Sequence, residues 1–324
     1  MYERLLRPLL FRLDAERAHN LGLWVIARGL VRTRLVTDPR LETSCMGLRF
    51  ANPIGLAAGL DKNGIAASRW QGLGFGFAEL GTVTPKPQPG NPQPRLFRIP
   101  AERAIINRMG FNNAGAEALT ARLHGRQFGI PIGINLGKNK TSEDAPADYR
   151  HSFELLGDHG DYFVINVSSP NTPGLRALQE KGALLEIIAA MQAVRRDKPI
   201  LVKVAPDLGF PELDDVLDVV HQTGLSGIIA TNTTLDRSVL RSDPHLEGGL
   251  SGAPLRAKST AVLSYLASKK PDGCALIGVG GVFTADDVRE KLDAGADLVQ
   301  VYSGWIYGGP ATVPRILLGL LDRR

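Results

Sequence analysis

The chain has little cysteine and no long apolar run. Its 324 residues include two cysteines, Cys45 and Cys274, whose separation fits neither a metal-site spacing nor a disulfide framework. We therefore expect ordinary thiols in a reducing compartment. No stretch reaches the roughly 18–20 apolar residues that a membrane-spanning helix requires. Charged residues also interrupt every apolar run near the start, which argues against a signal peptide.

Positive charge is concentrated at the beginning of the chain. Residues 1–40 hold eight arginines against four acidic residues, which accounts for +4 of the net charge of +5. A basic segment of this kind suggests an acidic surface nearby, either anionic lipid or nucleic acid. Because the remaining residues are nearly neutral, nucleic acid is a poor candidate partner for the whole protein.

The basic segment also has a helical pattern, which we expect over residues 1–36. Asp14 is the candidate N-cap, and an apolar stripe follows it. The stretch from Leu21 to Ala27 is apolar on every side of a helix. Two interpretations stay open, a helix lying in a membrane surface or a helix packed on the body of the protein. The expected stripe comprises Ala18, Leu21, Val25 and Gly29, and Leu23, Trp24, Ile26 and Leu30 widen it.

From residue 50 onward, short apolar runs alternate with amphipathic helical patterns. This alternation predicts an α/β fold, a (β/α)₈ TIM barrel, with the N-terminal residues as a small helical arm. A doubly wound open sheet is the alternative, but no GxGxxG motif follows the first strand. Strands are expected at 53–58, 77–82, 130–136, 162–168, 200–205, 227–232, 275–280 and 298–303. Helices are expected at 64–73, 114–124, 146–159, 180–196, 211–223, 255–268, 284–293 and 310–322.

Three connections are too long to be simple loops, namely residues 83–113, 169–179 and 233–254. All three follow the carboxyl ends of expected strands. In a parallel α/β protein that end carries the ligand site. The sequence therefore predicts a roofed pocket with a movable lid.

Polar groups end nearly every expected strand, and seven such ends converging on one pocket indicate a binding site. Lys203 lies inside an apolar strand, where a cation is costly unless it meets an anion. It either extends to the barrel rim or faces a group that becomes negative during a reaction. Lys62 likewise has two interpretations, as a solvated loop lysine or as a cation that binds a carboxylate. The glycines of residues 278–281 and 304 would let backbone amides approach a phosphate after the seventh and eighth strands.

The same strand ends lack histidine, and Asp61 and Asp207 are their only carboxylates. A zinc hydrolase or a glycosidase with paired carboxylates therefore fits poorly, and no metal site is expected. Amides, hydroxyls, two lysines and a phosphate cradle instead favour a bound cofactor that carries the chemistry.

Four ordered motifs, found along the whole chain, carry a resemblance. They are residues 57–64 (AAGLDKNG), 107–113 (NRMGFNN), 166–174 (NVSSPNTPG) and 278–281 (GVGG) followed by Tyr302-Ser303. Together they resemble dihydroorotate dehydrogenase of class 2, the membrane-associated and quinone-dependent type. The soluble class 1 enzymes resemble the barrel but lack the arm, and they carry cysteine where this chain has Ser169.

The resemblance implies roles for individual residues. FMN would contact Ala58, Gly59, Thr82, Asn135, Asn166, Lys203, Thr231, Gly252, Gly281, Tyr302 and Ser303. Dihydroorotate would contact Lys62, Asn107, Arg108, Met109, Gly110, Phe111, Asn166, Asn171, Asn232 and Thr233. Ser169 would be the catalytic base, its proton draining through water and Thr172, and His19 and Arg98 would line a quinone tunnel.

The implied reaction is the oxidation of (S)-dihydroorotate to orotate in pyrimidine synthesis, with FMN as hydride acceptor and a membrane quinone as final acceptor. Residues 1–40 would form the quinone and membrane arm and 41–324 the catalytic barrel. We expect a peripheral protein on the cytoplasmic face of a bacterial membrane, without nucleic acid or an obligatory protein partner. Two rivals are a tRNA-dihydrouridine synthase, which would need a basic face for RNA, and a non-catalytic phosphate-binding barrel.

Overall fold

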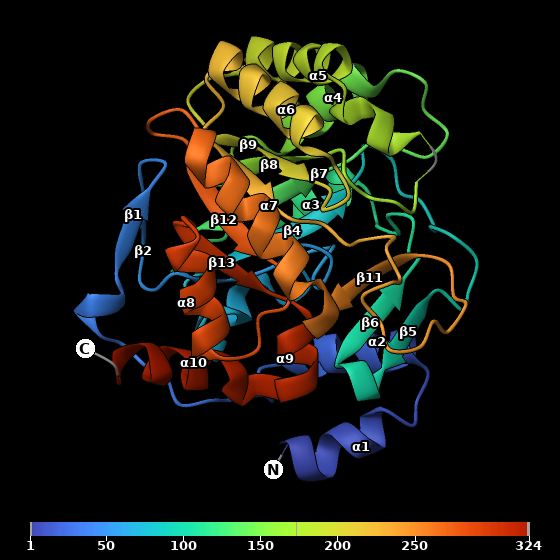
Figure 1. Cartoon of the computed structure of the whole chain (residues 1–324), viewed down its shortest axis with the longest axis vertical. Coiled ribbons are helices and arrows are strands. Elements are labelled where there is room, and N and C mark those ends of the chain that lie inside the picture. The colour runs from blue at the N-terminus through green and yellow to red at the C-terminus, as the bar shows by residue number, and fades with distance from the viewer. Residues whose placement is uncertain (1, 173, 323–324) are drawn as a thin grey trace.

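The computed structural model describes residues 2–172 and 174–322, and its centre is a closed barrel of eight parallel strands (Figure 1). The barrel closes where Val299 lies opposite Ile54. The predicted (β/α)₈ architecture is confirmed. The strands are β3 (Ile54–Leu56), β4 (Phe77–Val83), β7 (Ile132–Leu136), β8 (Tyr162–Asn166), β9 (Ile200–Val204), β10 (Gly227–Ala230), β12 (Ala275–Val279) and β13 (Leu298–Val301).

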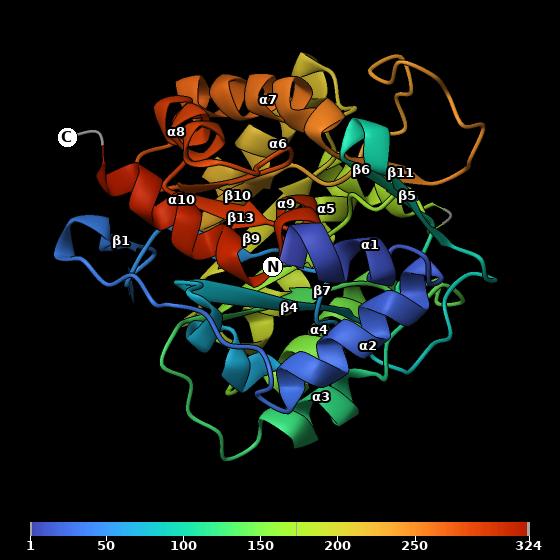
Figure 2. The same cartoon turned by 90° about the horizontal axis from the view of Figure 1, so that it is seen from below.

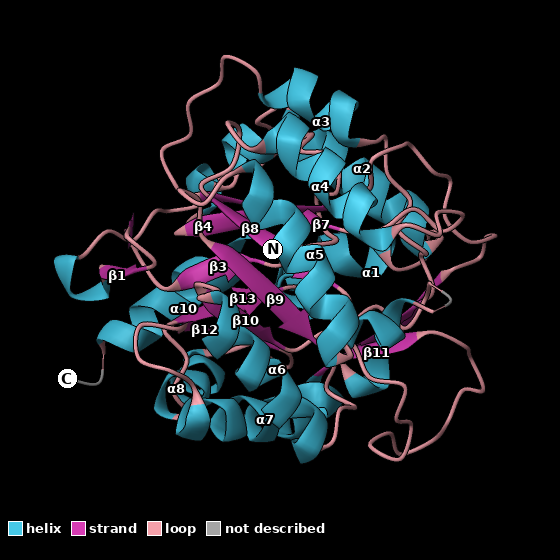
Figure 3. Ribbon diagram, turned by 90° about the horizontal axis from the view of Figure 1, so that it is seen from above, coloured by secondary structure: helices cyan, strands magenta, loops and turns pink. Residues whose placement is uncertain are grey.

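Helices surround the barrel strands (Figure 3). Seven of them match the helices expected from residue 114 onward to within a few residues. A short helix, α9 (Ser303–Gly308), begins directly after β13 and was not expected. The seven are α3 (Ala116–Leu123), α4 (Ala145–Leu156), α5 (Lys181–Val194), α6 (Phe210–Thr223), α7 (Arg256–Lys269), α8 (Ala285–Asp293) and α10 (Thr312–Leu321).

The helix expected at 64–73 was wrong, because this segment forms two short 3₁₀ turns, Ala67–Arg69 and Gln71–Leu73. The buried Asp61 carboxylate accepts the amide hydrogens of Ile65 and Ala66 at 2.7 and 2.8 Å. These local hydrogen bonds from the backbone to a side chain compete with the start of a regular helix. Gly74, at φ +93°, then ends the segment in a left-handed conformation that glycine adopts without strain.

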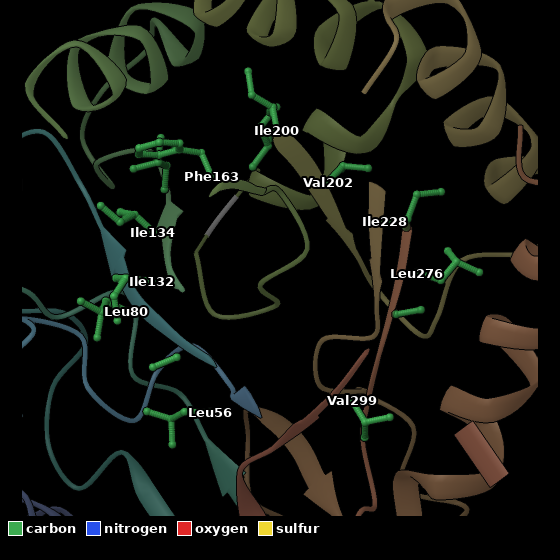
Figure 4. Close-up of a cluster of buried hydrophobic side chains, with 14 of the residues drawn as sticks. Leu56, Leu80, Ile132, Ile134, Phe163, Ile200, Val202, Ile228, Leu276 and Val299 are labelled. Atoms are coloured by element: carbon green, nitrogen blue, oxygen red, sulfur yellow. The ribbon is translucent and has the colours of Figure 1, made fainter. Parts of the chain in front are cut away.

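Two apolar layers hold the barrel together. The larger fills the space between the strands and the helices, and Figure 4 shows part of it. A smaller layer lies inside the barrel at the amino ends of the strands. Because both faces of each strand are buried, the strands read as nearly continuous apolar runs. The labelled side chains of the outer layer are Leu56, Leu80, Ile132, Ile134, Phe163, Ile200, Val202, Ile228, Leu276 and Val299.

Aromatic rings fill the inner layer. Phe50 belongs to an antiparallel hairpin of β1 (Thr43–Cys45) and β2 (Leu48–Phe50), and its ring meets Phe77 edge to face at 5.4 Å. Phe77 in turn lies 6.4 Å from Tyr162. Glycine is required beside these rings, because a Cβ at Gly55 or Gly133 would lie within 2.2 Å of a ring atom. The hairpin and the rings close this end of the barrel.

A three-stranded antiparallel sheet lies at the opposite end of the barrel. Its strands are β5 (Leu96–Ile99), β6 (Ala104–Asn107) and β11 (Gly249–Gly252), in the order β11-β6-β5. They come from two of the three long connections, 83–113 and 233–254. The predicted roof is therefore a sheet, whose regular structure sequence analysis did not find because each strand is only four residues long.

The N-terminal arm is helical over a shorter range than expected. A π-helical turn (Tyr2–Leu6), α1 (Arg7–Leu10) and α2 (Ala15–Ala27) are its regular elements. Asp14 is the N-cap of α2, as predicted, and its carboxylate accepts amide hydrogens from Glu16 and Arg17. The expected helix to residue 36 was wrong, because the chain leaves the helix at Gly29, whose φ is +71°.

The arm lies along the barrel, and α2 contacts β5 and the turn at 67–69 (Figure 2). The buried face of α2 carries Leu23 and Ile26, whereas Leu21 and Trp24 are exposed. The packed face therefore lies on two of the residues expected to widen the stripe, and not on its centre at Leu21. Packing on the body of the protein is thus confirmed for one face, whereas contact of the exposed apolar face with a membrane stays a prediction.

Candidate active site

A pocket with an empty volume of about 980 Å³ opens at the carboxyl ends of the barrel strands, beneath the roof sheet. This volume includes solvent at the mouth of the pocket, and the lining combines apolar side chains with polar groups, as is typical of a small-molecule or cofactor site. Most of the predicted site residues line it together. They are Ala58, Gly59, Lys62, Thr82, Asn107, Met109, Gly110, Phe111, Asn166, Ser169, Asn171, Lys203, Thr231, Asn232, Thr233, Gly252, Gly281, Tyr302 and Ser303.

Four asparagines in the pocket form two hydrogen-bonded pairs. Asn171 donates to Asn107 at 3.1 Å, which joins the loop after β8 to the roof sheet. Asn232 donates to Asn166 at 3.3 Å, which joins the ends of β10 and β8. Each carboxamide has a donor and an acceptor side, so together they suit a planar ligand with alternating C=O and N–H groups.

Ser169 lies directly after β8, and only 6% of its surface is exposed. Its hydroxyl accepts the backbone amide hydrogen of Asn171 at 3.3 Å. The nearby Thr172 has a buried hydroxyl that finds no hydrogen-bond partner among the described residues. A proton path from Ser169 through Thr172 stays a prediction. Pro173, in the same predicted motif, lies outside the described residues.

Lys62 is held over the pocket by the turn that follows β3. The preceding Asp61 is fully buried, and its bonds to the amides of residues 65 and 66 and to the Trp70 indole fix this turn. Burial lowers the pKa of Lys62 to about 8, Glu16 opposes this effect, and Arg95 adds to it. Asp61 is therefore a structural residue, while Lys62 is a partly buried cation available to an anionic ligand.

A buried carboxylate that sequence analysis missed lies beside Lys203. Glu79, in the middle of β4, is fully buried, and its carboxylate lies 3.9 Å from the Lys203 ammonium. Asn135 and Gln300 donate side-chain hydrogen bonds to its two oxygens at 2.8 and 2.5 Å. Burial lowers the pKa of Lys203, and the charge of Glu79 opposes that effect. The anion that Lys203 was expected to need is thus partly supplied by the protein.

The signal for Glu79 was an acidic residue within the apolar run of residues 77–83. Sequence analysis considered carboxylates only at strand ends, so this residue was overlooked. In a barrel, a side chain in mid-strand can face the interior as well as the helices. A lysine in one strand and a glutamate in another are together a better indicator of a buried ion pair than either alone.

Backbone atoms approach closely at one side of the pocket, near the ends of β12 and β13. A Cβ at Gly252, Gly281 or Gly304 would lie 2.0–2.3 Å from a neighbouring atom. The Ser251 and Ser303 hydroxyls, 2.9 Å apart, lie at the same side. This glycine-lined wall agrees with the predicted phosphate cradle.

Two of the residues predicted to contact FMN or dihydroorotate lie outside the pocket. Asn135 is buried behind it, where it accepts hydrogen bonds from Thr82 and Asn166 at 2.5 and 3.0 Å. Arg108 points away, toward the Pro94 carbonyl and Glu247. Asn135 therefore supports the pocket wall, and the structure gives the Arg108 side chain no contact with the site.

His19 and Arg98, the predicted tunnel residues, both lie where the arm meets the barrel. Arg98 donates to the carbonyls of Leu10 and Leu13 and covers the Phe11 ring at 4.6 Å. Burial and, to a smaller extent, the nearby Lys62 lower the pKa of His19 to about 4, while Glu16 opposes them. His19 is therefore neutral near pH 7 and lies close to Lys62.

A charged cluster fixes the loops around the pocket. Arg176 donates to the carbonyls of Ser168 and Thr233 and pairs with Asp207 at 3.0 Å. Asp207 also pairs with Lys258 at 2.8 Å. Asp207 is thus a loop anchor. Within residues 2–172 and 174–322, no three His, Cys, Asp or Glu side chains are grouped as a metal site would require.

Comparisons with known proteins agree with this geometry. A family model described as dihydroorotate dehydrogenase matches residues 40–323. The chain is 55% identical to dihydroorotate dehydrogenase (quinone) of Gloeobacter violaceus, over 99% of this chain and 94% of that protein. It is 52% identical to the Thermus thermophilus protein of the same name, over 96% and 94% respectively.

Solved structures indicate the same family. The crystal structure of DHODH from Eimeria tenella in complex with ferulenol superposes with a TM-score of 0.91 and 41% identity, covering 96% of this chain and 92% of that one. The ligand-free structure from the same organism gives a TM-score of 0.90. The chain therefore belongs to the dihydroorotate dehydrogenase family, within its quinone-dependent class 2.

Proposed function

We propose that this protein oxidises (S)-dihydroorotate to orotate in pyrimidine biosynthesis, using bound FMN, and passes the electrons to a quinone. The observation that carries the proposal is the ring of paired asparagines around Ser169 and Lys62 in one pocket. Together these groups suit a planar pyrimidine acid, because they offer amide pairing, a cation for its carboxylate and a hydroxyl for its proton.

The pocket is chemically suited to FMN. The glycine-lined wall with Ser251 and Ser303 suits its phosphate, and Lys203 suits the ring edge that becomes negative on reduction. Gln300 also lines the pocket, and its buried side-chain oxygen makes no hydrogen bond within the described residues. FMN held by these residues would supply the hydride-accepting chemistry that the oxidation of dihydroorotate at C6 requires.

The chain's own groups orient the substrate and remove its proton. Lys62 pairs with the substrate carboxylate, and the asparagine pairs bond the edges of its ring. Ser169 takes the proton from C5. A serine hydroxyl is a weak base without a partner, so the proton moves on through water past the unpaired Thr172 hydroxyl. The roof sheet covers the pocket, and covering a site in this way limits bulk water.

Binding of dihydroorotate should weaken above about pH 8. The pKa of Lys62 in the free protein is lowered to about 8, so Lys62 is charged below that pH and neutral above it. A neutral lysine cannot pair with the substrate carboxylate, so the apparent Kd should rise about tenfold for each further pH unit. The measurement is anaerobic bleaching of the flavin at increasing dihydroorotate concentration, repeated from pH 6 to 10.

Two variants separate the lysine's charge from other effects. Lys62→Gln should bind dihydroorotate weakly at all pH values, while Lys62→Arg should bind it and lose the alkaline weakening, because arginine stays charged. If Lys62→Gln bound dihydroorotate as tightly as the native protein, Lys62 would not be the carboxylate ligand. If the native protein carried no flavin, or dihydroorotate did not bleach it, the proposed function would be wrong.

The arm is suited to a membrane surface. Eight of the twelve large hydrophobic side chains that the described structure leaves exposed lie between Leu5 and Leu35. Arginines accompany them, and the guanidinium of Arg28 covers the exposed Trp24 ring at 3.8 Å. Apolar side chains among basic ones are typical of helices that lie in an anionic membrane surface. In the described chain no helix is long and apolar enough to cross a bilayer.

We infer that the arm holds the protein on the cytoplasmic face of a membrane and that quinone enters beside His19 and Arg98. The double variant Leu9→Glu/Trp24→Glu should lose most of its co-sedimentation with vesicles of phosphatidylcholine and phosphatidylglycerol. Its flavin should still be bleached by dihydroorotate. Leu235→Glu, which alters an equally exposed leucine outside the arm, is the control. Equal sedimentation of both variants would exclude the arm as the membrane-binding surface.

A further inference from the structure

A buried ion pair connects the arm to the segment that precedes the roof sheet. Glu16 in α2 receives two hydrogen bonds from the guanidinium of Arg95, at 2.6 and 3.0 Å. Both side chains are only 9% exposed. A buried charge that loses its partner is strongly unfavourable. Removing Glu16 would therefore disturb Arg95 far more than the loss of a surface contact would.

Arg95 in turn shapes the chain around residue 90. The remaining guanidinium nitrogen, Nη1, donates to the carbonyls of Pro89 and Asn91 at 2.6 and 2.7 Å, which closes a tight loop. Gly90 in this loop has φ +78°, and a Cβ there would lie 2.3 Å from the carbonyl oxygen of Met109. The loop at 89–91 thus rests directly on the segment that contributes Met109, Gly110 and Phe111 to the pocket.

Asn91 connects this loop to both sides of the substrate pocket. Its side-chain amide donates to the carbonyls of Arg108 and Asn171, each at 3.0 Å. Its backbone amide donates to the Met109 carbonyl at 3.0 Å. Since Asn171 also pairs with Asn107, Asn91 holds the backbone of one asparagine pair from behind.

The same ion pair borders Lys62. The charge of Glu16 raises the pKa of Lys62 against its burial, and Arg95 lowers it. His19, on the same helix as Glu16, is the third group near Lys62, and the positive charge of Lys62 lowers the pKa of His19. Glu16 is therefore the acidic group of the arm that stabilises the charged form of the substrate lysine.

We propose that Glu16 of the arm and Arg95 are positioning residues for dihydroorotate, holding the loop at 89–91 and thereby the Asn107–Asn171 pair in place. The inference rests on the proposed function and extends it, because it makes the arm part of the substrate site as well as the quinone site. From the sequence, residues 1–40 were expected to serve only the quinone and the membrane, because every expected strand and every predicted flavin contact lies after residue 50.

The test compares Glu16→Gln with Glu3→Gln in the full-length protein carrying its flavin. Glu3 forms the other arm-to-barrel ion pair, with Arg315 at 2.7 Å, but both partners are substantially exposed. Glu16→Gln should weaken dihydroorotate binding about tenfold, the usual effect of losing a hydrogen bond to a charged group. The bleaching rate at saturation and the KM for a quinone analogue should change little. Glu3→Gln should match the native protein in all three.

Two further measurements distinguish positioning from general loosening of the arm. In Glu16→Gln the alkaline weakening of dihydroorotate binding should begin at a lower pH, because Lys62 has lost its acidic neighbour. Asn91→Ala should weaken binding without moving that pH, since it breaks the loop contacts but keeps Glu16. It also decides the matter should Glu16→Gln fail to fold.

Equal dihydroorotate affinity in Glu16→Gln and Glu3→Gln, or an unchanged affinity in Asn91→Ala, would overturn the proposal. So would a rise in the quinone KM parallel to the loss of dihydroorotate affinity without a shift in the pH profile, since that result describes a displaced arm. None of these outcomes would contradict the reaction proposed for the native protein. Failure of the native protein to be bleached would instead refute the proposed function itself.

Discussion

Replacing Ser169 with alanine should leave a protein that binds flavin and orotate but whose flavin is reduced by dihydroorotate about 10²–10⁴ times more slowly near neutral pH, the usual contribution of a general base. The pocket offers no histidine or carboxylate beside this hydroxyl among its described lining residues. Stopped-flow bleaching of the flavin measures the chemical step without any contribution from quinone. A near-normal rate would remove Ser169 from the role of base.

The neighbouring serine is the matched control. Ser168 is also buried, but its hydroxyl lies outside the pocket lining and bonds to Asn166 and Asn232. Ser168→Ala should therefore weaken substrate binding more than it slows bleaching at saturation. Ser169→Cys should retain part of the native rate, because a thiol can accept the same proton.

The second large effect should be on stability. Glu79→Ala should lower the free energy of unfolding by about 3–5 kcal/mol, because removing one partner of a buried ion pair leaves the other charge uncompensated. The change also deprives the side-chain amides of Asn135 and Gln300 of their acceptor. Urea unfolding monitored by circular dichroism gives the shift in midpoint, and flavin release should accompany it because Lys203 lines the pocket.

Companion variants identify the cause. Glu79→Gln keeps an acceptor for one amide and should be less destabilised than Glu79→Ala. Adding Lys203→Met to Glu79→Ala removes the uncompensated charge, so the double variant should be more stable than Glu79→Ala alone. If Glu79→Ala unfolded at the native urea concentration, the ion pair would have no measurable structural role.

The barrel could be predicted from the sequence because its signal is repeated. Eight short apolar runs separated by amphipathic patterns leave few alternatives, and all eight strands were found. The roof sheet has no such repetition. Its strands β6 and β11 are separated by more than 140 residues, and Asn107 faces Gly249 only because the barrel brings their loops together. Pairing at that distance leaves no local pattern.

The candidate site also has a part that could be predicted from the sequence and a part that could not. Polar residues at strand ends were predictable, because the carboxyl ends of parallel strands share one edge of the barrel. The resemblance to the family then supplied individual roles, which family membership supports and which stay predictions residue by residue. Glu79 and the Glu16–Arg95 pair were not found, because each joins segments that nothing in the local sequence relates.

The arm was the least predictable part. Its composition indicated a helix with an apolar surface, and the Asp14 N-cap was correct. Periodicity could not tell which apolar face packs, because the stretch from Leu21 to Ala27 is apolar all round. Packing against the body of the protein determines the face, because Leu23 and Ile26 are buried there and Trp24 is left exposed.

The arm has one more consequence, which concerns self-association. A closed barrel has no free strand edge, but the roof sheet has two, and unpaired edges can recruit a strand from another molecule. On the β11 side, Thr234 pairs with Leu250 in an isolated bridge. On the β5 side, the arm lies alongside, with Arg98 bonded to the carbonyls of Leu10 and Leu13. The arm thus covers one edge of the roof sheet and shields it from edge-to-edge aggregation.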